Sequence, residues 1–448
     1  MFDASLHYGV LGLARSGIAA AYKIKELGGK AFLSDLLTRD QIPSADQLCR
    51  DFACEFGGHT DKLLDCDVWI VSPGIPLNAP IIQTGRQKGI RMISEIEFGW
   101  QIKAEDSIVI AITGSNGKST TASLIHHLLI SLGRNSILAG NIGDAFCSFP
   151  IHKPGIEYIV LEISSFQLDL VHSFAPHVAV LLNLSPDHLN RYNGFSDYCA
   201  SKMNIFRYQG PQDFAVLYLD SAEITRRDAN LKAWKLYFSR EATIAPAHLD
   251  GKFICIGQHR LSIYDLPIKG PHNQLNTMAA LLCIQALELD IPQAMNSVKS
   301  FMSLPHRLEF VASVNGVSFY NDSKATNTDS VKSALESFER PIRIILGGSD
   351  KGEDYSQITD ALQTHAIRAY ITGDSRYKMQ QTWLGKVPLI LVDDFEECVR
   401  LAWEESTLGD NIVLSPACAS FDKFKNFEHR GETFKQIVRK LKSEKEQA

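Results

Sequence analysis

The sequence predicts an α/β protein whose three domains have mainly parallel sheets. At 448 residues the chain is longer than a single hydrophobic core supports. Short β-branched apolar runs alternate with segments of helical period, which is typical of parallel βαβ units. A glycine-rich turn at 114–117 joins one such run to a helix. We expect domains at residues 1–98, 99–303 and 304–448.

The first domain is predicted to be Rossmann-like. Strands are expected at residues 8–12, 31–34 and 68–71, with a helix at 18–27 after a glycine turn. The glycines of that turn do not keep G-x-G-x-x-G spacing, so they indicate either close helix packing or a ligand site. A ligand would lie beyond the carboxyl ends of the strands. The residues expected there are Leu13, Asp35, Ser72 and Gly74.

The turn in the central domain is predicted to bind phosphate. Its glycines are followed at a helix start by Lys118 and three hydroxyl residues. Backbone N–H groups of such a turn surround an anion, which the lysine and hydroxyls help to hold. The ordinary P-loop pattern needs glycine at Ile112, but strain relief alone would not explain the lysine, so the pattern favours a P-loop-type ATPase domain. The expected ATP-binding residues here are Gly114, Ser115, Asn116, Gly117, Lys118, Ser119 and Thr120.

Polar residues follow neighbouring strands of the central domain. Glu162 ends a strand, where a carboxylate beside a phosphate turn suits Mg²⁺ or contacts the next helix start. Asp187 and His188 follow the next strand, and His188 would bind a metal, orient a phosphate or remain solvated. Lys202 lies on the helix beyond, where lysine is ordinarily a surface charge. Asn141 suits a phosphate or substrate contact, or a simple turn.

The last domain is predicted to be a second Rossmann-like unit. Its expected strands are 317–320, 343–346, 369–372 and 411–415. Each of the last three runs into a turn or helix signal, which favours parallel pairing. Loops rich in hydroxyl and lysine donors follow at 320–327, 347–351 and 415–427. They indicate either a pocket for an anionic small molecule or a solvated face.

Charge and cysteine content exclude several classes of protein. The net charge of -6 gives no diffuse basic field for nucleic acid or anionic lipid. The start of the chain lacks signal-peptide features, and no apolar stretch is long enough to span a bilayer. Nine cysteines without C-x-x-C pairs argue against a disulfide framework or a zinc site. We therefore expect a cytoplasmic protein with reduced thiols, no membrane insertion and no nucleic-acid partner.

Motifs spread over essentially the whole chain give it a resemblance to the Mur ligase family. They are T-G-S-N-G-K-S-T at 113–120, G-N-I-G at 140–143, L-E-I-S-S-F-Q-L at 161–168, N-L-S-P-D-H-L-N-R at 183–191, G-P-H-N at 270–273, P-H-R-L-E at 305–309, N-D-S-K-A-T-N at 321–327 and S-P-A-C-A-S-F-D at 415–422. The D-N-P-R motif of the sibling ligase that adds a diamino acid is absent. The motifs are most similar to those of members that add D-glutamate to UDP-N-acetylmuramoyl-L-alanine.

The resemblance implies an ATP-dependent acid–amino-acid ligase of peptidoglycan precursor synthesis. ATP would phosphorylate the carboxylate of the L-alanyl end of the UDP-sugar to give an acyl phosphate. The amine of D-glutamate would then attack, and phosphate would leave from a tetrahedral intermediate. The resemblance also implies two Mg²⁺ sites and a CO₂-derived carbamate on Lys202. We expect a monomer.

The family's functional residues are carried over to matching positions of this chain. Lys118 would hold the β and γ phosphates, with Ser119 and Glu162 on a first Mg²⁺. His188 would serve a second Mg²⁺, supported by carbamylated Lys202. Further implied ATP contacts are Asn273, His306 and Arg307. The implied contacts to the UDP-substrate are Leu13, Asp35, Ser72, Gly74 and Asn141, and those to D-glutamate are Thr326, Lys351, Ser420 and Phe427.

Three other functions explain parts of the sequence. Another Mur or folylpolyglutamate-type ligase would use the same ATP chemistry with a different amino acid. A nucleotide-binding regulator that has lost catalysis would lack Lys118, Glu162 or His188, and all three are present. An NAD-dependent dehydrogenase would explain the first βαβ unit but not the turn at Lys118.

Overall fold

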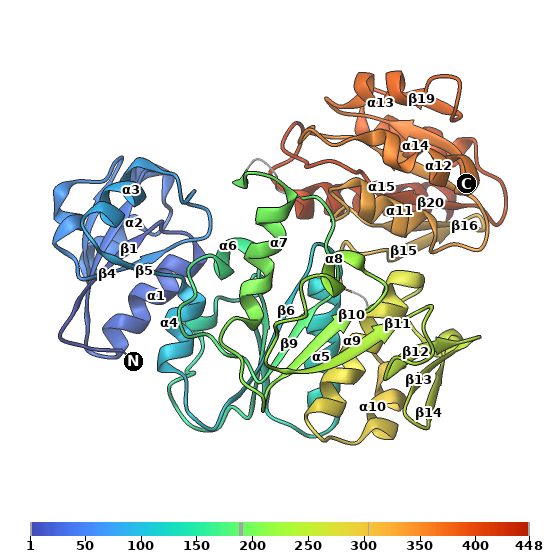
Figure 1. The fold of residues 1–448 in the computed structure, drawn as a ribbon. Coiled ribbons are helices and arrows are strands. Elements are labelled where there is room, and N and C mark those ends of the chain that lie inside the picture. The colour runs from blue at the N-terminus through green and yellow to red at the C-terminus, as the bar shows by residue number, and fades with distance from the viewer. Residues whose placement is uncertain (1, 188–190, 303, 447–448) are drawn as a thin grey trace. The chain divides into compact units, whose positions relative to one another are not determined.

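The computed structural model describes residues 2–187, 191–302 and 304–446. It contains three α/β sheets, one after another along the chain, and this confirms the predicted fold class (Figure 1). The chain divides into two compact units. Residues 1–263 and 275–299 form the first unit, and residues 264–274 and 300–448 form the second. The domain boundaries at 98 and 303 remain predictions.

The first sheet has five parallel strands in the order β3-β2-β1-β4-β5. The strands are β1 (His7–Leu11), β2 (Lys30–Asp35), β3 (Ala53–Phe56), β4 (Val68–Val71) and β5 (Arg91–Ile93). The helices are α1 (Arg15–Glu26), α2 (Ala45–Asp51), α3 (Pro80–Gln87) and α4 (Glu95–Ile102), with 3₁₀ turns at Arg39–Gln41 and Asp61–Asp65. The two edge strands, β3 and β5, were not predicted, because each is short and lacks an apolar run. The strand order reverses between β1 and β4, which is where open α/β sheets bind ligands.

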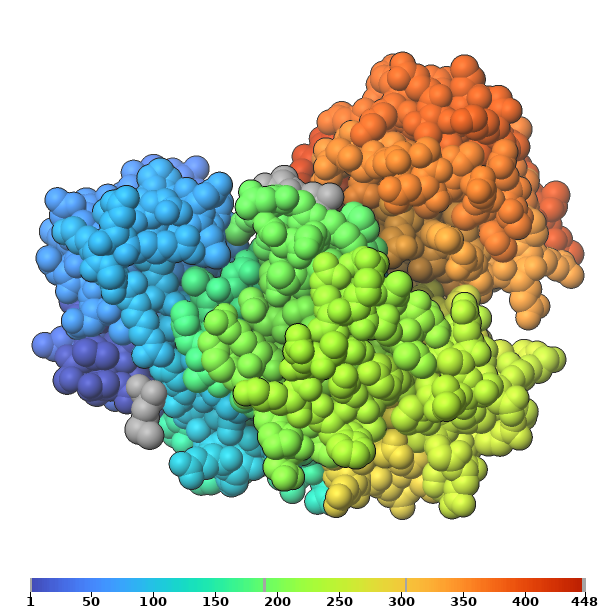
Figure 2. Space-filling view, viewed as in Figure 1, coloured from blue at the N-terminus to red at the C-terminus, as the bar shows by residue number. Residues whose placement is uncertain are grey.

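The central sheet has nine strands in the order β14-β13-β12-β11-β10-β9-β6-β8-β7. They are β6 (Ile108–Thr113), β7 (Ser136–Gly140), β8 (Tyr158–Glu162), β9 (Val178–Leu181), β10 (Phe214–Tyr218), β11 (Trp234–Ser239), β12 (Ala247–Asp250), β13 (Phe253–Ile256) and β14 (His259–Ser262). The last three pair antiparallel and form the yellow-green edge of this unit in Figure 2. The other pairs are parallel. The loop-bearing strand β6 therefore lies between β9 and β8, so that their carboxyl ends flank its turn.

Helices of the central region cover this sheet and extend beyond it. They are α5 (Lys118–Ser131), α6 (Ser165–Leu168), α7 (Phe195–Met203), α8 (Ala222–Thr225), α9 (Pro271–Ala286) and α10 (Ile291–Val298), with 3₁₀ turns at Phe146–Ser148 (η3), Asn204–Phe206 and Ile263–Asp265. A core of buried aliphatic side chains from β6, β8 and β9 holds the sheet to its helices. Burial of these apolar strands on both faces explains why they read as continuous hydrophobic runs.

The third sheet has six strands in the order β15-β16-β20-β17-β18-β19. They are β15 (Glu309–Val314), β16 (Val317–Asn321), β17 (Ile342–Leu346), β18 (Ala366–Ile371), β19 (Leu389–Leu391) and β20 (Asn411–Leu414). Its helices are α11 (Thr328–Leu335), α12 (Thr359–His365), α13 (Arg376–Trp383), α14 (Phe395–Glu404) and α15 (Phe427–Glu446), with a 3₁₀ turn at Tyr355–Ile358. All pairs are parallel except β15 with β16. The predicted strands and their parallel pairing are confirmed.

Two chain-wide expectations can be compared with the structure. All nine cysteines are free thiols, and seven of them are buried. None of the helices in the described residues is long and apolar enough to cross a bilayer.

Candidate functional site

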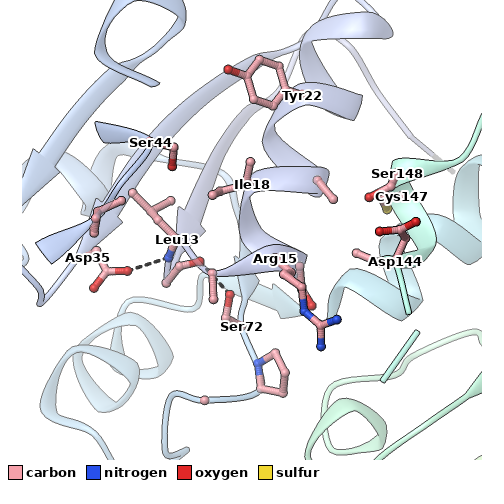
Figure 3. Close-up of a pocket in the computed structure, with 18 of the residues that line it drawn as sticks. Leu13, Arg15, Ile18, Tyr22, Asp35, Ser44, Ser72, Asp144, Cys147 and Ser148 are labelled. Carbon is pink, nitrogen blue, oxygen red and sulfur yellow. Dashed lines mark hydrogen bonds between the residues drawn. The ribbon is translucent and has the colours of Figure 1, made fainter. Parts of the chain in front are cut away.

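A cavity of about 1030 Å³ lies beyond the carboxyl ends of β1, β2 and β4 in the first unit. The Leu13 N–H donates to Oδ2 of Asp35 at 2.6 Å, and the Ser72 hydroxyl donates to the Gly12 carbonyl at 2.7 Å (Figure 3). These bonds tie three strand ends together at the point where the strand order reverses. The five residues predicted to contact the UDP-substrate all line this cavity: Leu13, Asp35, Ser72, Gly74 and Asn141.

The glycine turn before α1 is required by packing. A Cβ on Gly17 would lie 1.9 Å from the Gly12 carbonyl oxygen, and Gly12 itself has a φ of 83°. The helix therefore starts close against the end of β1. Ala14 occupies its N-cap and offers no side-chain acceptor, so the first-turn N–H groups are not capped by that residue. Such a helix start attracts anions.

A second strand, turn and helix form the predicted phosphate loop. Gly117 is the N-cap of α5 with a φ of 84°, and a Cβ there would lie 2.4 Å from Oδ1 of Asn276. The loop is shaped from the end of β9, because Asn183 accepts from the Ser115 N–H at its carbonyl and from the Asn116 N–H at its Oδ1, at 3.1 and 2.8 Å. Asn183 belongs to the quoted motif at 183–191, but sequence reasoning assigned it no role.

Two lysines of the central region point at one oxygen of this loop. The Gly114 carbonyl accepts from Nζ of Lys118 at 2.8 Å and from Nζ of Lys202 at 2.9 Å. Lys202 is 2% exposed and lies over the ring of Tyr198, so it is not a surface charge. Burial first, and then the charge of Lys118, hold the pKa of Lys202 well below its ordinary value. The Tyr198 hydroxyl also contacts Ser115 at 3.0 Å, a role that the sequence did not indicate.

Glu162 ends β8 beside the phosphate loop and is almost fully buried. Its Oε1 accepts from the Asn141 side-chain amide at 2.7 Å, whereas the cap of the following helix is Ser164. The cap of that helix is therefore Ser164 and not Glu162. Buried carboxylate and hydroxyl oxygens, here Glu162 with Ser119, are hard ligands of the kind that Mg²⁺ shares with phosphate oxygens and water. His188 lies outside the described residues.

Arg191 connects the two sheets of the first unit. It donates to the carbonyls of Pro73, Gly74 and Ile75 at 3.0 to 3.2 Å, and it stacks on the ring of Phe166 with 4.4 Å to the ring centroid. The turn that contains Ser72 and Gly74 is thus fixed to the segment that follows β9. The sequence around Arg191 does not indicate these hydrogen bonds, because the three carbonyls that accept them lie more than 110 residues away in the chain.

In the second unit, polar loops follow three neighbouring strands. β16, β20 and β17 are adjacent and parallel, so their carboxyl ends share one edge of the sheet. Thr326, Ser420 and Lys351 lie in the loops after these strands, and Phe427 begins α15. Ser420 is buried, whereas Lys351 is exposed. The topology therefore places the four predicted D-glutamate contacts around one end of this sheet.

A buried arginine on α15 donates hydrogen bonds to two of these loops and so holds them together. The Arg430 guanidinium donates to the Ser323 hydroxyl and carbonyl and to the carbonyls of Cys418 and Ala419, at 2.9 to 3.2 Å. Ser323 in turn donates to the Phe427 carbonyl at 2.8 Å. Sequence reasoning missed Arg430, because an arginine in a charged helix normally faces water.

The predicted ATP contacts of the second unit are Asn273 on α9, and His306 and Arg307 just before β15. His306 is buried with a φ of 64°, and its Nδ1 is 2.9 Å from the Asn321 amide nitrogen. Asn273 donates to the Lys269 carbonyl at 2.8 Å. Burial raises the pKa of Asp322 to about 7, although the Ser415 hydroxyl and the charge of Arg307 oppose that shift. Asp322 is a buried, readily protonated carboxyl in a motif quoted from the sequence.

The architecture is that of a three-sheet α/β protein whose central sheet carries a strand, glycine turn and helix of the P-loop type. Comparison with known families matches residues 7–94 to the Mur ligase MurD-like N-terminal domain, 112–284 to the Mur ligase middle domain and 306–418 to the Mur ligase glutamate ligase domain. The chain belongs to the Mur ligase family.

Full-length relatives and solved structures agree with this assignment. UDP-N-acetylmuramoylalanine–D-glutamate ligases of Cytophaga hutchinsonii and Koribacter versatilis are 41% and 38% identical over 96% of this chain and 98% and 97% of their own lengths. The MurF ligase of Thermotoga maritima in complex with ADP has the same fold, with a TM-score of 0.66 at 17% identity, covering 98% of this chain and all of that one. The UDP-N-acetylmuramate-alanine ligase MurC of the same organism gives a TM-score of 0.63 at 16% identity, with 97% and 99% covered.

Proposed function

We propose that this protein is an ATP-dependent ligase that joins D-glutamate to UDP-N-acetylmuramoyl-L-alanine in peptidoglycan precursor synthesis. The observation that carries the proposal is the 38–41% identity to relatives of that name over nearly the whole chain. The shared three-domain fold alone would not choose among amino acids, since MurC and MurF share it.

The residues of the phosphate loop are suited to the first step. Lys118 begins α5 and Ser119 and Thr120 follow it, so a triphosphate would meet a helix start, an ammonium and two hydroxyls. An oxygen of the substrate carboxylate attacks the γ-phosphorus and the bond to the β-phosphate oxygen breaks, which gives an acyl phosphate and ADP. Positioning and charge stabilisation are the main contributions a protein makes to such a transfer.

Ser119 and Glu162 would hold a first Mg²⁺, and His188 with Lys202 a second. The metal supplies charge neutralisation of the phosphate oxygens. In the second step the D-glutamate amine attacks the acyl carbon, and the carbon–oxygen bond to phosphate breaks. We assign the γ-carboxylate of D-glutamate to Thr326, Lys351, Ser420 and Phe427, and ATP to Asn273, His306 and Arg307 besides the loop.

The surroundings of Lys202 support carbamylation. A neutral amine attacks CO₂ and releases one proton, and both burial and Lys118 favour the neutral form of Lys202. The product is an anion next to the ammonium of Lys118, so a neutral amine is replaced by the negative partner of an ion pair. That anion would then support the second Mg²⁺.

Isotope transfer tests the function and the mechanism together. The protein is incubated with ATP, D-glutamate and UDP-N-acetylmuramoyl-L-alanine that carries ¹⁸O in its carboxylate. Label should appear in inorganic phosphate, because the oxygen that attacks ATP leaves with the phosphoryl group. Product formation with unlabelled phosphate would refute the acyl phosphate.

A panel of acceptor amino acids separates the main alternative. Phosphate release that depends on D-glutamate supports the proposal, and release that depends on another amino acid favours a different Mur or folylpolyglutamate-type ligase. Release with no acceptor dependence would point to a regulator, and hydride transfer to a nicotinamide cofactor to a dehydrogenase. We further expect the protein to be a cytoplasmic monomer.

A further inference from the structure

The cavity of the first unit is lined by two cations, Lys23 and Arg15, and the motifs assign a role to neither. Arg15 is the first residue of α1, lines the cavity and is exposed. Its Nη1 donates to the Gly143 carbonyl at 2.5 Å, across the cavity from its own helix. Figure 3 shows it pointing away from α1 toward the segment that carries Asp144.

The charges that line the cavity make this residue decisive for an anionic ligand. The charged residues there are Arg15, Lys23, Glu26, Asp35 and Asp144. Lys23 is buried and pairs with Glu26 at 2.6 Å, whereas Arg15 forms no ion pair with any described residue. Of the two cations that line the cavity, Arg15 is therefore the one that is not paired with a carboxylate of the described residues, and it is the charge that an incoming diphosphate would meet.

Arg15 holds the position that Lys118 holds in the phosphate loop. Each is the first residue of a helix that begins just after a glycine turn at the end of a parallel strand. A guanidinium has five N–H donors in a planar fork, and only its Nη1 is engaged with Gly143. Its other donors make no hydrogen bond within the part of the chain that the structure describes, and the first turn of α1, to which Arg15 belongs, has no side-chain cap, so an anion is favoured there.

We propose that Arg15 binds the diphosphate of the sugar-nucleotide substrate and thereby selects substrates that carry it. The inference rests on the proposed function, because it assumes that the cavity takes a nucleoside diphosphate sugar. The guanidinium reaches the phosphate oxygens from the start of α1 while it contacts the turn at Gly143. It therefore orients the substrate between the two sheets of the first unit.

The test compares Arg15→Ala and Arg15→Lys with wild type on two substrates, UDP-N-acetylmuramoyl-L-alanine and N-acetylmuramoyl-L-alanine. Loss of a charge-assisted contact should raise KM for the first substrate on the order of tenfold to a hundredfold, with kcat changed by less than about twofold. Lysine keeps the positive charge but lacks the planar fork of donors, so the KM of Arg15→Lys for this substrate should lie between those of wild type and Arg15→Ala. With the second substrate, all three proteins should have the same KM.

Arg50→Ala is the matched control, because Arg50 is exposed on α2, bonds only to Gln47 and does not line the cavity. A similar KM increase on both substrates, a loss of kcat, or no change in Arg15→Ala would overturn the inference. Calorimetric titration with UDP separates this failure from that of the proposed function. If wild type does not bind UDP, the proposed function fails; if wild type and Arg15→Ala bind UDP equally, only the role of Arg15 fails.

Discussion

The first unit contains two glycine turns of similar construction and different chemistry. The turn from β1 to α1 and the turn from β6 to α5 each follow a buried parallel strand, contain a glycine with a φ near 84°, and lead to a helix whose first residue is a cation. The second turn also has hydroxyls at Ser119 and Thr120 and lies beside the buried carboxylate of Glu162. The first turn has one hydroxyl in that place, Ser16, and its buried carboxylate is Asp35.

The two turns differ in the chemical groups that they leave available to bind a ligand. At the first turn, the carboxylate of Asp35 accepts from the N–H groups of Leu13 and Leu37, so it stabilises the backbone there. At the second, the side-chain nitrogens of Lys118 and Lys202 both donate to the Gly114 carbonyl, and the pKa of Lys202 is held well below its ordinary value. A helix start with one cation is enough to hold a diphosphate, whereas transfer of a phosphoryl group also needs metal ligands and balanced charge.

The largest expected effect is at Lys118. Lys118→Met would remove the ammonium that stabilises the transferring phosphoryl group, so kcat for phosphate release should fall on the order of 10³-fold. The matched change Arg15→Ala should act on KM instead. Unchanged turnover in Lys118→Met would mean that the second turn does not handle the γ-phosphate.

Lys202→Ala should have the next largest effect. Loss of a group that supports a metal site reduces activity about 10- to 100-fold. Added short carboxylic acids should restore part of the activity, because they supply the missing anion to the cavity left by the side chain. Steady-state phosphate release with and without acetate measures this rescue, and full activity without any acid would contradict the assigned role.

Gly17→Ala should damage the first turn and spare the second. Its Cβ would lie 1.9 Å from the Gly12 carbonyl oxygen, so the start of α1 must shift. A loss of about 1.4 kcal/mol of substrate binding corresponds to a tenfold higher KM for the UDP-sugar. KM for ATP should stay near the wild-type value, and an equal rise in both would show that the two turns are not independent.

The smallest expected effect is on stability and comes from Glu95, which bonds α4 to the 3₁₀ turn at Phe146–Ser148. Glu95, at the start of α4, is fully buried; its Oε1 accepts from the Cys147 N–H at 2.6 Å, and burial raises its pKa to about 7 from 4.5. The folded state therefore binds more protons between these pH values. Its stabilising contribution is complete below pH 4.5 and is lost as the pH rises through 7, by at most ~3 kcal/mol.

Thermal unfolding of Glu95→Gln and wild type at pH 5 and pH 8 measures this contribution. The wild type should lose stability relative to the variant at pH 8, because glutamine stays neutral and can still accept from Cys147. Parallel pH profiles for the two proteins would show that Glu95 does not titrate in this range.

Much of the fold was predictable, because its signals are local. The apolar runs that became β6, β8 and β9 are buried on both faces, and the glycine turns at their ends follow from backbone geometry. Strands β3 and β5 escaped prediction because edge strands of three or four residues lack a continuous apolar run. The residues expected to contact the UDP-substrate line one cavity because parallel strands end at a common edge.

Local sequence patterns were sufficient to predict the strand–turn–helix at Lys118, the order of parallel units along the chain and the family, since each depends on residues close together in the chain. The contacts of Arg15, Arg191 and Arg430 could be found only in the folded protein. Each of the three binds a partner more than 100 residues away in the chain, at Gly143, at Pro73 to Ile75 and at Ser323 respectively. A long charged side chain reads as solvated in any local pattern, and only folding brings the backbone carbonyls that it binds within reach.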